Sequence, residues 1–211
     1  MGVAERKKRE KKMRRDQIQI AAKKVFLEKG FRSTTMEEIA EVAELSVGSI
    51  YQYFINKDEL YASLNILSLQ YLDKEITKIK NKKNSNGQQK LKALHKALLK
   101  TYEYEPLILR NILHIQLEGT LGLLSRELLL QIQELTQKCV RGIGSLFEEG
   151  IRKGQYRNHH SMALTDIAWS MFTGIVLYET SKTQLNPRKD YLKSTLRKAF
   201  EIFYLGIAKG N

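Results

Sequence analysis

The sequence predicts an all-α protein with about nine helices. Only two prolines occur in its 211 residues, so few positions interrupt a helix. Leu, Lys, Glu, Ile and Ala are plentiful, which is typical of helical proteins. Apolar residues recur every three or four positions, whereas the strict alternation of a half-buried strand is hard to find. A chain of this length can form one substantial core, or a small domain joined to a larger one.

The first predicted helix covers residues 14–29, where apolar residues form one face and Gly30 follows as a stop signal. Thr34 and Thr35 each stand three residues before a glutamate, so either can open a second helix with a capping box. The sequence leaves open which of the two threonines is the cap. Ser46 predicts the start of a third helix after a short turn.

A fourth, longer helix is predicted to start at Asn56 and to run to about residue 80. The polar segment 81–89 is predicted to be a loop. Five more helices are expected at about residues 90–104, 106–118, 124–153, 161–183 and 188–208. This pattern divides the chain into an N-terminal domain, residues 1–60, and a larger helical domain, residues 61–211.

The formal net charge of +13 favours anionic partners such as nucleic acid. Residues 1–60 contribute +3 and residues 61–211 contribute +10, so net charge alone does not locate a binding site. The first domain contains a dense basic arm made of Arg6, Lys7, Lys8, Arg9, Lys11, Lys12, Arg14 and Arg15. Charge runs of this kind are often solvated, and part of this arm is expected to be frayed.

The single cysteine, Cys139, excludes an internal disulfide, and the N-terminus lacks the apolar core of a secretory signal. A cytoplasmic protein is therefore expected, with Cys139 as an inert buried thiol. The longest apolar run, residues 163–178, contains Asp166 and is shorter than the ~20 residues of a membrane helix. The sequence shows no catalytic motif and no metal-ligand cluster, so no enzyme activity, metal or cofactor is expected.

The second and third helices have the pattern of a helix-turn-helix, whose second helix reads base edges in the DNA major groove. Gly48 allows a close backbone approach, and Ser49 can donate or accept a hydrogen bond. Val47 can contact a thymine methyl group, and Gln52 can pair with adenine. Ser46 is expected at the DNA as well, although a cap alone would explain it.

Phosphate contacts are predicted next to this helix. The hydroxyl groups of Tyr51 and Tyr53 suit phosphate oxygens. Lys57 stands in the first turn of the fourth helix, where free backbone N–H groups also favour a phosphate. A cation there opposes the helix dipole, and a bound phosphate would explain it. The alternatives are a partly buried Tyr51 and a solvated Lys57.

A longer pattern supports this interpretation. It consists of Ile18, Ala21-Ala22, Phe26, Gly30, Thr34-Thr35, Ile39-Ala40, Gly48, Ile50-Tyr51, Phe54, Lys57 and Leu60. At these spacings the segment resembles the DNA-binding half of the TetR/AcrR family of bacterial transcriptional regulators. The resemblance implies phosphate contacts from Thr34 or Thr35, Tyr51, Tyr53 and Lys57, and a recognition helix that carries Val47, Gly48, Ser49 and Gln52.

The sequence departs from the family pattern at two positions. Glu44 stands where the turn usually has glycine, so a residue with a side chain must adopt a left-handed or distorted conformation. Val47 stands where the family often has lysine, which removes one potential DNA contact. Affinity for the operator would then depend more on the basic arm.

The resemblance implies that residues 61–211 bind a ligand and form a dimer. Large side chains with polar tips are candidates for an apolar ligand pocket, although a core position is the alternative for each: Tyr102, His114, Trp169 and Phe172. The last two helices carry more apolar surface than one core needs, which favours a two-fold interface. The residues expected there are Leu164, Ile175, Leu192, Leu196 and Phe203.

These observations predict a homodimeric, sequence-specific regulator that binds double-stranded DNA. We expect a repressor that a small apolar or amphipathic ligand releases from a palindromic operator. The alternative is a DNA-binding architectural protein without a ligand. The large second domain favours the regulator, because a protein that only binds DNA does not need it.

Overall fold

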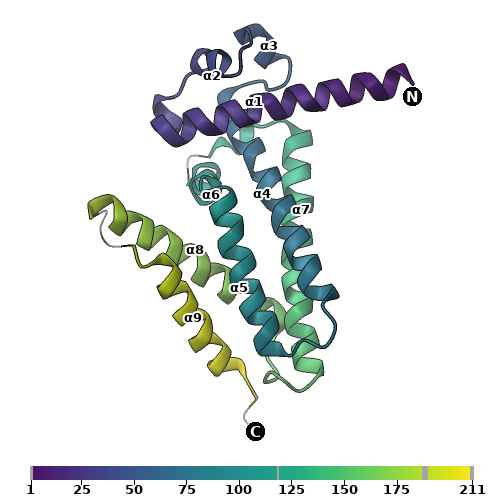
Figure 1. The fold of residues 1–211 in the computed structure, drawn as a ribbon, viewed down its shortest axis with the longest axis vertical. Helices are drawn as coiled ribbons and strands as arrows, with labels where there is room; N and C mark the ends of the chain where they lie inside the picture. Colours follow the sequence, from purple (N-terminus) through teal and green to yellow (C-terminus); the bar gives the residue numbers. More distant parts are fainter. Residues whose placement is uncertain (1, 118, 187–189, 210–211) are drawn as a thin grey trace. The chain divides into compact units, whose positions relative to one another are not determined.

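The computed structural model describes residues 2–117, 119–186 and 190–209. Within these ranges the chain forms nine α-helices and one short 3-10 helix (Figure 1). The β-structure of the described residues is limited to an isolated bridge between Tyr156 and Ala208. The prediction of an all-α fold with about nine helices is confirmed.

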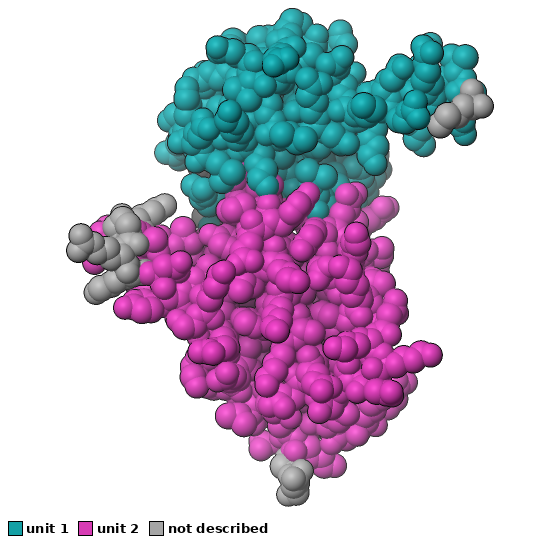
Figure 2. All heavy atoms as spheres, viewed as in Figure 1, with its two compact units in different colours: residues 1–67, 110–132 teal, residues 68–109, 133–211 magenta. Residues whose placement is uncertain are grey.

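The chain divides into two compact units, which Figure 2 shows in different colours. Unit 1 comprises residues 1–67 and 110–132, and unit 2 comprises residues 68–109 and 133–211. Unit 1 is larger than the N-terminal domain expected at residues 1–60, because a second segment from the middle of the chain packs with it. Sequence periodicity does not reveal such a contact between distant segments.

Unit 1 begins with α1, Val3–Ser33, which starts eleven residues before the predicted first helix. No proline or glycine interrupts residues 3–29, so the basic arm continues the helix instead of fraying. Gly30 breaks the regular geometry with φ 78° and ψ 166°, which is why the last turn after it is kinked. The first turns of α1 project from the rest of unit 1 (Figures 1 and 2).

The next three helices follow the predicted caps. Helix α2, Met36–Val42, is capped by Thr35, whose hydroxyl oxygen accepts a hydrogen bond from the backbone N–H of Glu38. Helix α3, Val47–Tyr51, is capped by Ser46. Helix α4, Lys57–Asn81, starts where the Asn56 side chain accepts from the backbone N–H of Glu59 at 2.7 Å. The structure therefore decides between the two threonines in favour of Thr35.

The core of unit 1 joins these helices. Side chains that are almost completely buried come from α1, α2, α3, the turn after it and α4: Ile18, Phe26, Ile39, Ile50, Phe54 and Leu60. Burial of large apolar side chains of this kind contributes about 1.5–3 kcal/mol each relative to exposure. This packing holds the short helix α3, which has too few residues to be stable alone.

The turn between α2 and α3 has the strained geometry that its sequence predicts. Glu44 adopts a φ of 54°, the left-handed region that glycine tolerates best. We expect Glu44→Gly to raise the free energy of unfolding by about 1 kcal/mol, because the side-chain strain is removed. Urea unfolding measures this change. Asn84→Gly is the matched control: Asn84 has a φ of 60°, but asparagine tolerates this region, so a smaller gain is expected. A stability loss in Glu44→Gly would contradict the strain argument.

The remaining helices begin with α5, Gly87–Tyr104, whose N-cap is Asn86. Its start lies three residues before the predicted one, because Asn86 and Gln89 form a capping box inside the segment expected to be a loop. The other elements are α6, Ile108–Leu117, the 3-10 helix, Thr120–Leu123, α7, Arg126–Arg152, α8, Ser161–Leu185, and α9, Leu192–Ile207.

Tyr156 is a structural residue at the base of unit 2. Its ring is buried, and its hydroxyl donates a hydrogen bond to the carbonyl oxygen of Gly87 at 2.6 Å. A side chain at Gly150 would place Cβ 2.2 Å from the Tyr156 ring, so the helix needs a glycine there.

Cys139 is also buried, and burial raises the pKa of its thiol to about 12. A thiol with this pKa is protonated at neutral pH, as expected for an inert cysteine.

Helix α8 has nearly the predicted bounds and leaves much of its apolar surface exposed in the monomer. Residues 161–183 are long and apolar enough to cross a membrane by length and composition, although the apolar run alone is shorter. Only 28% of the most apolar stretch is buried within the monomer, so α8 is not covered on nearly all sides by its own chain. Ile167 and Tyr178 are 50% and 66% exposed. Exposed apolar surface of this kind is typical of a site of interaction.

Candidate nucleic-acid interface

Helix α3 presents small and polar groups to the outside of unit 1. Its inward face is held by Ile50, which is fully buried. Gly48 and Gln52 are exposed, and Val47 and Ser49 are partly exposed. A Cβ placed on Gly48 would meet nothing within 4 Å, so the space beside it is open. This arrangement allows a base edge or a sugar-phosphate strand to approach the helix closely.

The N-terminus of α3 is ordered by its own serines. The Ser46 hydroxyl accepts from the backbone N–H of Ser49 at 3.2 Å, and the two hydroxyl groups lie 2.8 Å apart. Both side chains therefore have defined orientations before any DNA is bound. Ser46 is exposed, and one hydrogen-bonding direction of each hydroxyl group points away from this pair.

A hollow of about 230 Å³ connects the end of α3 with the basic helix α1. Lys11 and Arg15 of α1 line it together with Tyr51 and Gln52. The guanidinium of Arg15 stacks over the Phe54 ring, 4.5 Å from its centroid, which fixes it beside the recognition helix. The hollow also contains two carboxylates, Glu59 and Glu127. Glu59 is buried and accepts from the backbone N–H of Ile55 and from the Ser125 hydroxyl, so its charge is partly compensated.

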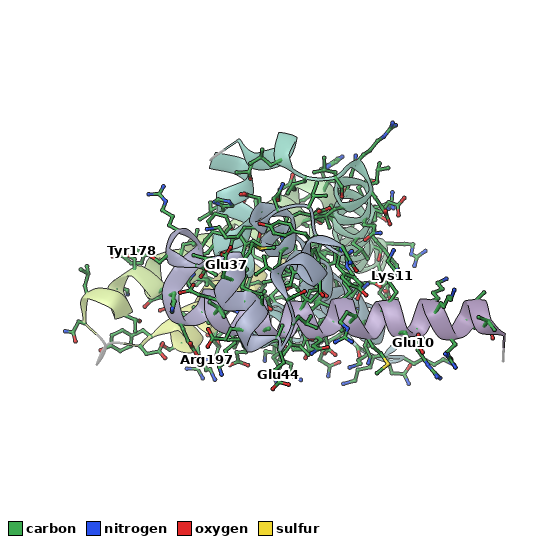
Figure 3. The ribbon with its side chains drawn as sticks, turned by 90° about the horizontal axis from the view of Figure 1, so that it is seen from above. Glu10, Lys11, Glu37, Glu44, Tyr178 and Arg197 are labelled. Atoms are coloured by element: carbon green, nitrogen blue, oxygen red, sulfur yellow. The ribbon has the colours of Figure 1, made fainter. Side chains whose placement is uncertain are left out.

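The projecting part of α1 has an acid-free side. At 3.6 residues per turn, Lys7, Lys8, Lys11, Arg14 and Arg15 cluster on one side, away from the acids of this segment. In Figure 3, Lys11 is labelled above the ribbon of α1 and Glu10 on its lower side. Glu10 instead pairs with Arg6 at 3.2 Å. The sequence indicated the charge of this arm, but its helical order became visible only in the structure.

Thr34 does not face outward, and its prediction as a phosphate contact is wrong. Its side chain is buried, and its hydroxyl donates to the carbonyl oxygen of Gly30 at 2.7 Å. This hydrogen bond gives a partner to a carbonyl oxygen near the C-terminal end of α1. Thr35 remains exposed, although its hydroxyl is used as the α2 cap. Two neighbouring threonines in an extended segment point to opposite sides, and only one of them can face the solvent.

Lys57 has a role that the sequence did not show. Its ammonium donates to the carbonyl oxygens of Phe31 and Thr34 at 2.9 and 2.8 Å, and it lies 4.5 Å from the centroid of the Phe31 ring. The cation thus binds the C-terminal end of α1, where the helix dipole favours it. This contact explains a lysine at the start of α4 without a phosphate. Two of its three N–H donors are already used.

We therefore expect Lys57→Met to lower the free energy of unfolding by about 1–3 kcal/mol, because buried carbonyl groups lose a charged donor. Chemical unfolding of the variant measures this loss. Lys24→Met, at an exposed position of α1, is the control and should change stability by less than about 0.5 kcal/mol. Unchanged stability in Lys57→Met would mean that the lysine is available for phosphate alone.

A polar cluster ties α6 to the start of α4 within unit 1. His114 lies 2.9 Å from Asp58 through its Nε2, and its ring packs 4.1 Å from the Phe31 ring centroid. Asn111 is fully buried and donates to the carbonyl oxygen of Tyr61. His114 therefore supports the packing of unit 1, and its assignment to a ligand pocket remains a prediction. The sequence separation of more than fifty residues hid this contact.

The other predicted pocket residues lie in unit 2. Tyr102 contacts Thr180 through the two hydroxyl groups, 3.3 Å apart. Phe172 is buried, and the partly exposed Trp169 has its ring centroid 5.9 Å away from that of Phe172. In the part of the chain that the structure describes, Tyr102, Trp169 and Phe172 do not line the cavity between α5 and α9, the hollow beside α3 or the one around residues 148–161. Their assignment to a pocket remains a prediction.

Two of the predicted dimer residues are core residues. Leu164 and Leu196 are 3% and 0% exposed, so they pack within their own unit and cannot meet a partner. Ile175, Leu192 and Phe203 are partly exposed. An apolar stripe in the sequence does not show which of its sides covers the monomer's own core.

The described part of the chain contains no group of three or more His, Cys, Asp or Glu side chains that could hold a metal ion. The site thus consists of a helix that can read bases, flanking hydroxyl groups and a basic helix beside it. All of these groups are suited to a polyanion with readable edges.

Comparisons with known proteins agree with this geometry. Residues 19–64 match the family described as bacterial regulatory proteins, tetR family, and residues 70–209 match the QacR-like protein, C-terminal region. The chain is 26% identical over 196 residues to the HTH-type transcriptional regulator QacR of Staphylococcus aureus, which covers 92% of this chain and 98% of that protein.

Other relatives share the same features. The negative transcriptional regulator IcaR of the biofilm operon icaADBC, from Staphylococcus aureus, is 28% identical over 136 residues, covering 64% of this chain and 70% of IcaR. The solved structure of the TetR family regulator PfmR from Thermus thermophilus has a TM-score of 0.71 at 19% identity, and covers 91% of this chain and 99% of that one. Together the two family matches span both units, and the chain belongs to the TetR family of bacterial transcriptional regulators, with a QacR-like C-terminal region.

Proposed function

We propose that this protein is a cytoplasmic, dimeric repressor that binds a near-palindromic operator and is released by a small ligand. The observation that carries the proposal is the hollow in which the exposed end of α3 meets Lys11 and Arg15 of α1. It places groups that can read base edges directly beside groups that neutralise phosphates. Sequence-specific binding needs both kinds of contact.

Repression is supported by the relatives. IcaR is described as a negative regulator, and the solved structure of SmeT is described as the repressor of a multidrug efflux pump. We transfer this mode of action to the present protein.

The dimer is supported by exposed apolar residues on the last two helices. Ile167 and Tyr178 of α8 and Ile202 of α9 are each at least half exposed in the monomer. A two-fold contact would cover them, and it would present two recognition helices to successive major grooves about 34–36 Å apart. A monomer offers only one of these helices.

Ligand release requires that the ligand binds the DNA-free conformation more tightly than the DNA-bound one. The chain offers a path for this coupling. Helix α4 runs from the DNA-binding unit into unit 2, since residues 57–67 belong to the first unit and residues 68–81 to the second. We propose an apolar or amphipathic effector that binds unit 2 and changes the geometry of this helix.

The role of Gln52 tests the proposed readout. Gln52→Ala should weaken binding to the preferred operator by about 1–3 kcal/mol and relax the preference at one base position in each half-site, because its amide no longer pairs with a base. Quantitative binding to a panel of single-base operator variants measures this change. Tyr51→Phe is the matched variant, since it removes one hydroxyl group of a half-exposed side chain. It should weaken binding to all panel members equally.

If Gln52→Ala weakens binding to every operator variant of the panel equally, Gln52 does not read a base. If the wild-type protein binds all operator variants of the panel with the same affinity, the result favours the alternative, an architectural DNA-binding protein. The basic arm alone would be sufficient for such binding, because phosphate contacts carry no sequence information.

A further inference from the structure

A groove between α5 and α9 in unit 2 has no role in the contacts described above. The two helices pack side by side (Figure 1) and leave a cavity of about 390 Å³ between their outer edges. This volume falls within the range of small-molecule sites. Leu91 and Phe200 are almost completely buried at its floor, and Tyr204 and Leu205 continue the apolar lining.

The rim of this groove is cationic. Lys92, Lys96 and Arg197 line it and are exposed, and none of them forms an ion pair with another residue that the structure describes. Figure 3 shows Arg197 at the outer edge of the view. The acid of the lining, Glu201, pairs with Lys198 at 3.0 Å and also interacts electrostatically with Arg197 and Lys92, so it offsets one of the three positive charges of the rim. The groove therefore has an apolar floor below an excess of positive charge.

His95 adds a polar group at the floor. Its ring centroid lies 5.2 Å from that of Phe200, and its Nε2 is buried without a hydrogen-bond partner among the described residues. Burial, with the charges of Lys96 and Arg197, lowers the pKa of His95, so the ring is neutral at neutral pH. A buried polar atom without a partner costs free energy, which a ligand atom at hydrogen-bond distance would recover.

We propose that this groove binds a small amphipathic anion, with its apolar chain on Leu91 and Phe200 and its carboxylate between His95 and the cationic side chains of the rim. A neutral imidazole can donate to such a carboxylate through its N–H. An amphipathic cation of the same size would meet a rim with more positive than negative side chains, since Lys92, Lys96 and Arg197 outnumber Glu201. The inference narrows the ligand class of the proposed function, and it rests on that function only in regarding the ligand as an effector.

The test uses full-length protein without DNA and three probes that share one alkyl chain: dodecanoate, dodecanol and dodecyltrimethylammonium. Isothermal titration calorimetry below the concentrations at which the probes form micelles gives the affinities. We expect dodecanoate to bind about tenfold more tightly than dodecanol, and dodecyltrimethylammonium to bind most weakly. Equal affinities, or a preference for the cation, would overturn the proposal.

A charge reversal assigns the binding to the groove. Lys96→Glu with Arg197→Glu changes two exposed side chains and should reverse the order, so that dodecyltrimethylammonium binds more tightly than dodecanoate. Lys83→Glu with Arg141→Glu is the matched control, because it makes the same change in net charge outside the groove. The control should keep the wild-type order. A reversal in the control as well would show a general charge effect and overturn the assignment.

Operator binding is measured separately for the same proteins. If the wild-type protein binds its operator but shows no preference for dodecanoate, the groove proposal is overturned and the proposed function is not affected. Failure of the wild-type protein to recognise any operator concerns the proposed function alone, since the probe titrations contain no DNA.

Discussion

Replacing Lys7, Lys8 and Lys11 together by glutamine is expected to weaken operator binding by about hundredfold at near-physiological salt. These lysines lie on the acid-free side of a helix that projects from unit 1, and Lys11 lines the hollow beside the recognition helix. Each phosphate contact that is lost lowers the magnitude of the slope of log K against log salt by about 0.9. Because a dimer carries the three substitutions twice, the magnitude of the slope should decrease by about 2–5.

Binding titrations over a series of salt concentrations measure this slope. The matched control replaces Lys80, Lys82 and Lys83 by glutamine, which removes the same charge from exposed lysines around the end of α4. The control should leave the slope almost unchanged. If both triple variants lose the same affinity and the same slope, the effect belongs to net charge, and the arm makes no direct phosphate contact.

The second large effect is expected from the dimer surface. Ile167→Glu together with Ile202→Glu places two charges on apolar positions that are 50% and 61% exposed in the monomer. The folded monomer should tolerate both changes, because neither side chain is part of its core. Two linked half-site contacts exceed a single contact by about 10²–10⁴ in affinity, so operator binding should fall by about hundredfold or more.

Sedimentation at several protein concentrations, together with operator titrations, tests this prediction. We expect the variant to sediment as a monomer and to keep the circular dichroism of the wild type. Val3→Glu with Ile20→Glu, at exposed apolar positions of α1, is a control that should remain dimeric. A variant that stays dimeric with unchanged operator affinity would show that the interface lies elsewhere on the surface.

Local features of the fold could be predicted from the sequence because their causes are local. The caps Ser46 and Asn56 act on backbone groups within three residues, so their side chains and spacing are sufficient. The left-handed or distorted conformation expected for Glu44 rested on the family pattern, which usually has glycine at this position, and the φ of 54° confirms it. The recognition surface of α3 follows from the burial of Ile50 on its opposite face.

Features that depend on distant segments could not be predicted. Lys57 binds carbonyl groups at the end of α1, and His114 pairs with Asp58, more than fifty positions away. Nothing in the local spacing of these residues indicates such partners. Leu164 and Leu196 belong to helices that also carry exposed apolar residues, such as Ile167 and Ile202. Only the packing of the chain decides which side is covered.

The central claim is that this protein recognises a specific, two-fold symmetric DNA sequence. Selection of bound duplexes from a random DNA pool at near-physiological salt tests it most directly. We expect a palindromic motif whose two half-sites are about one helical turn apart, and whose enrichment is reduced in the Ile167→Glu, Ile202→Glu variant. Salt-sensitive binding without any enriched sequence would contradict it.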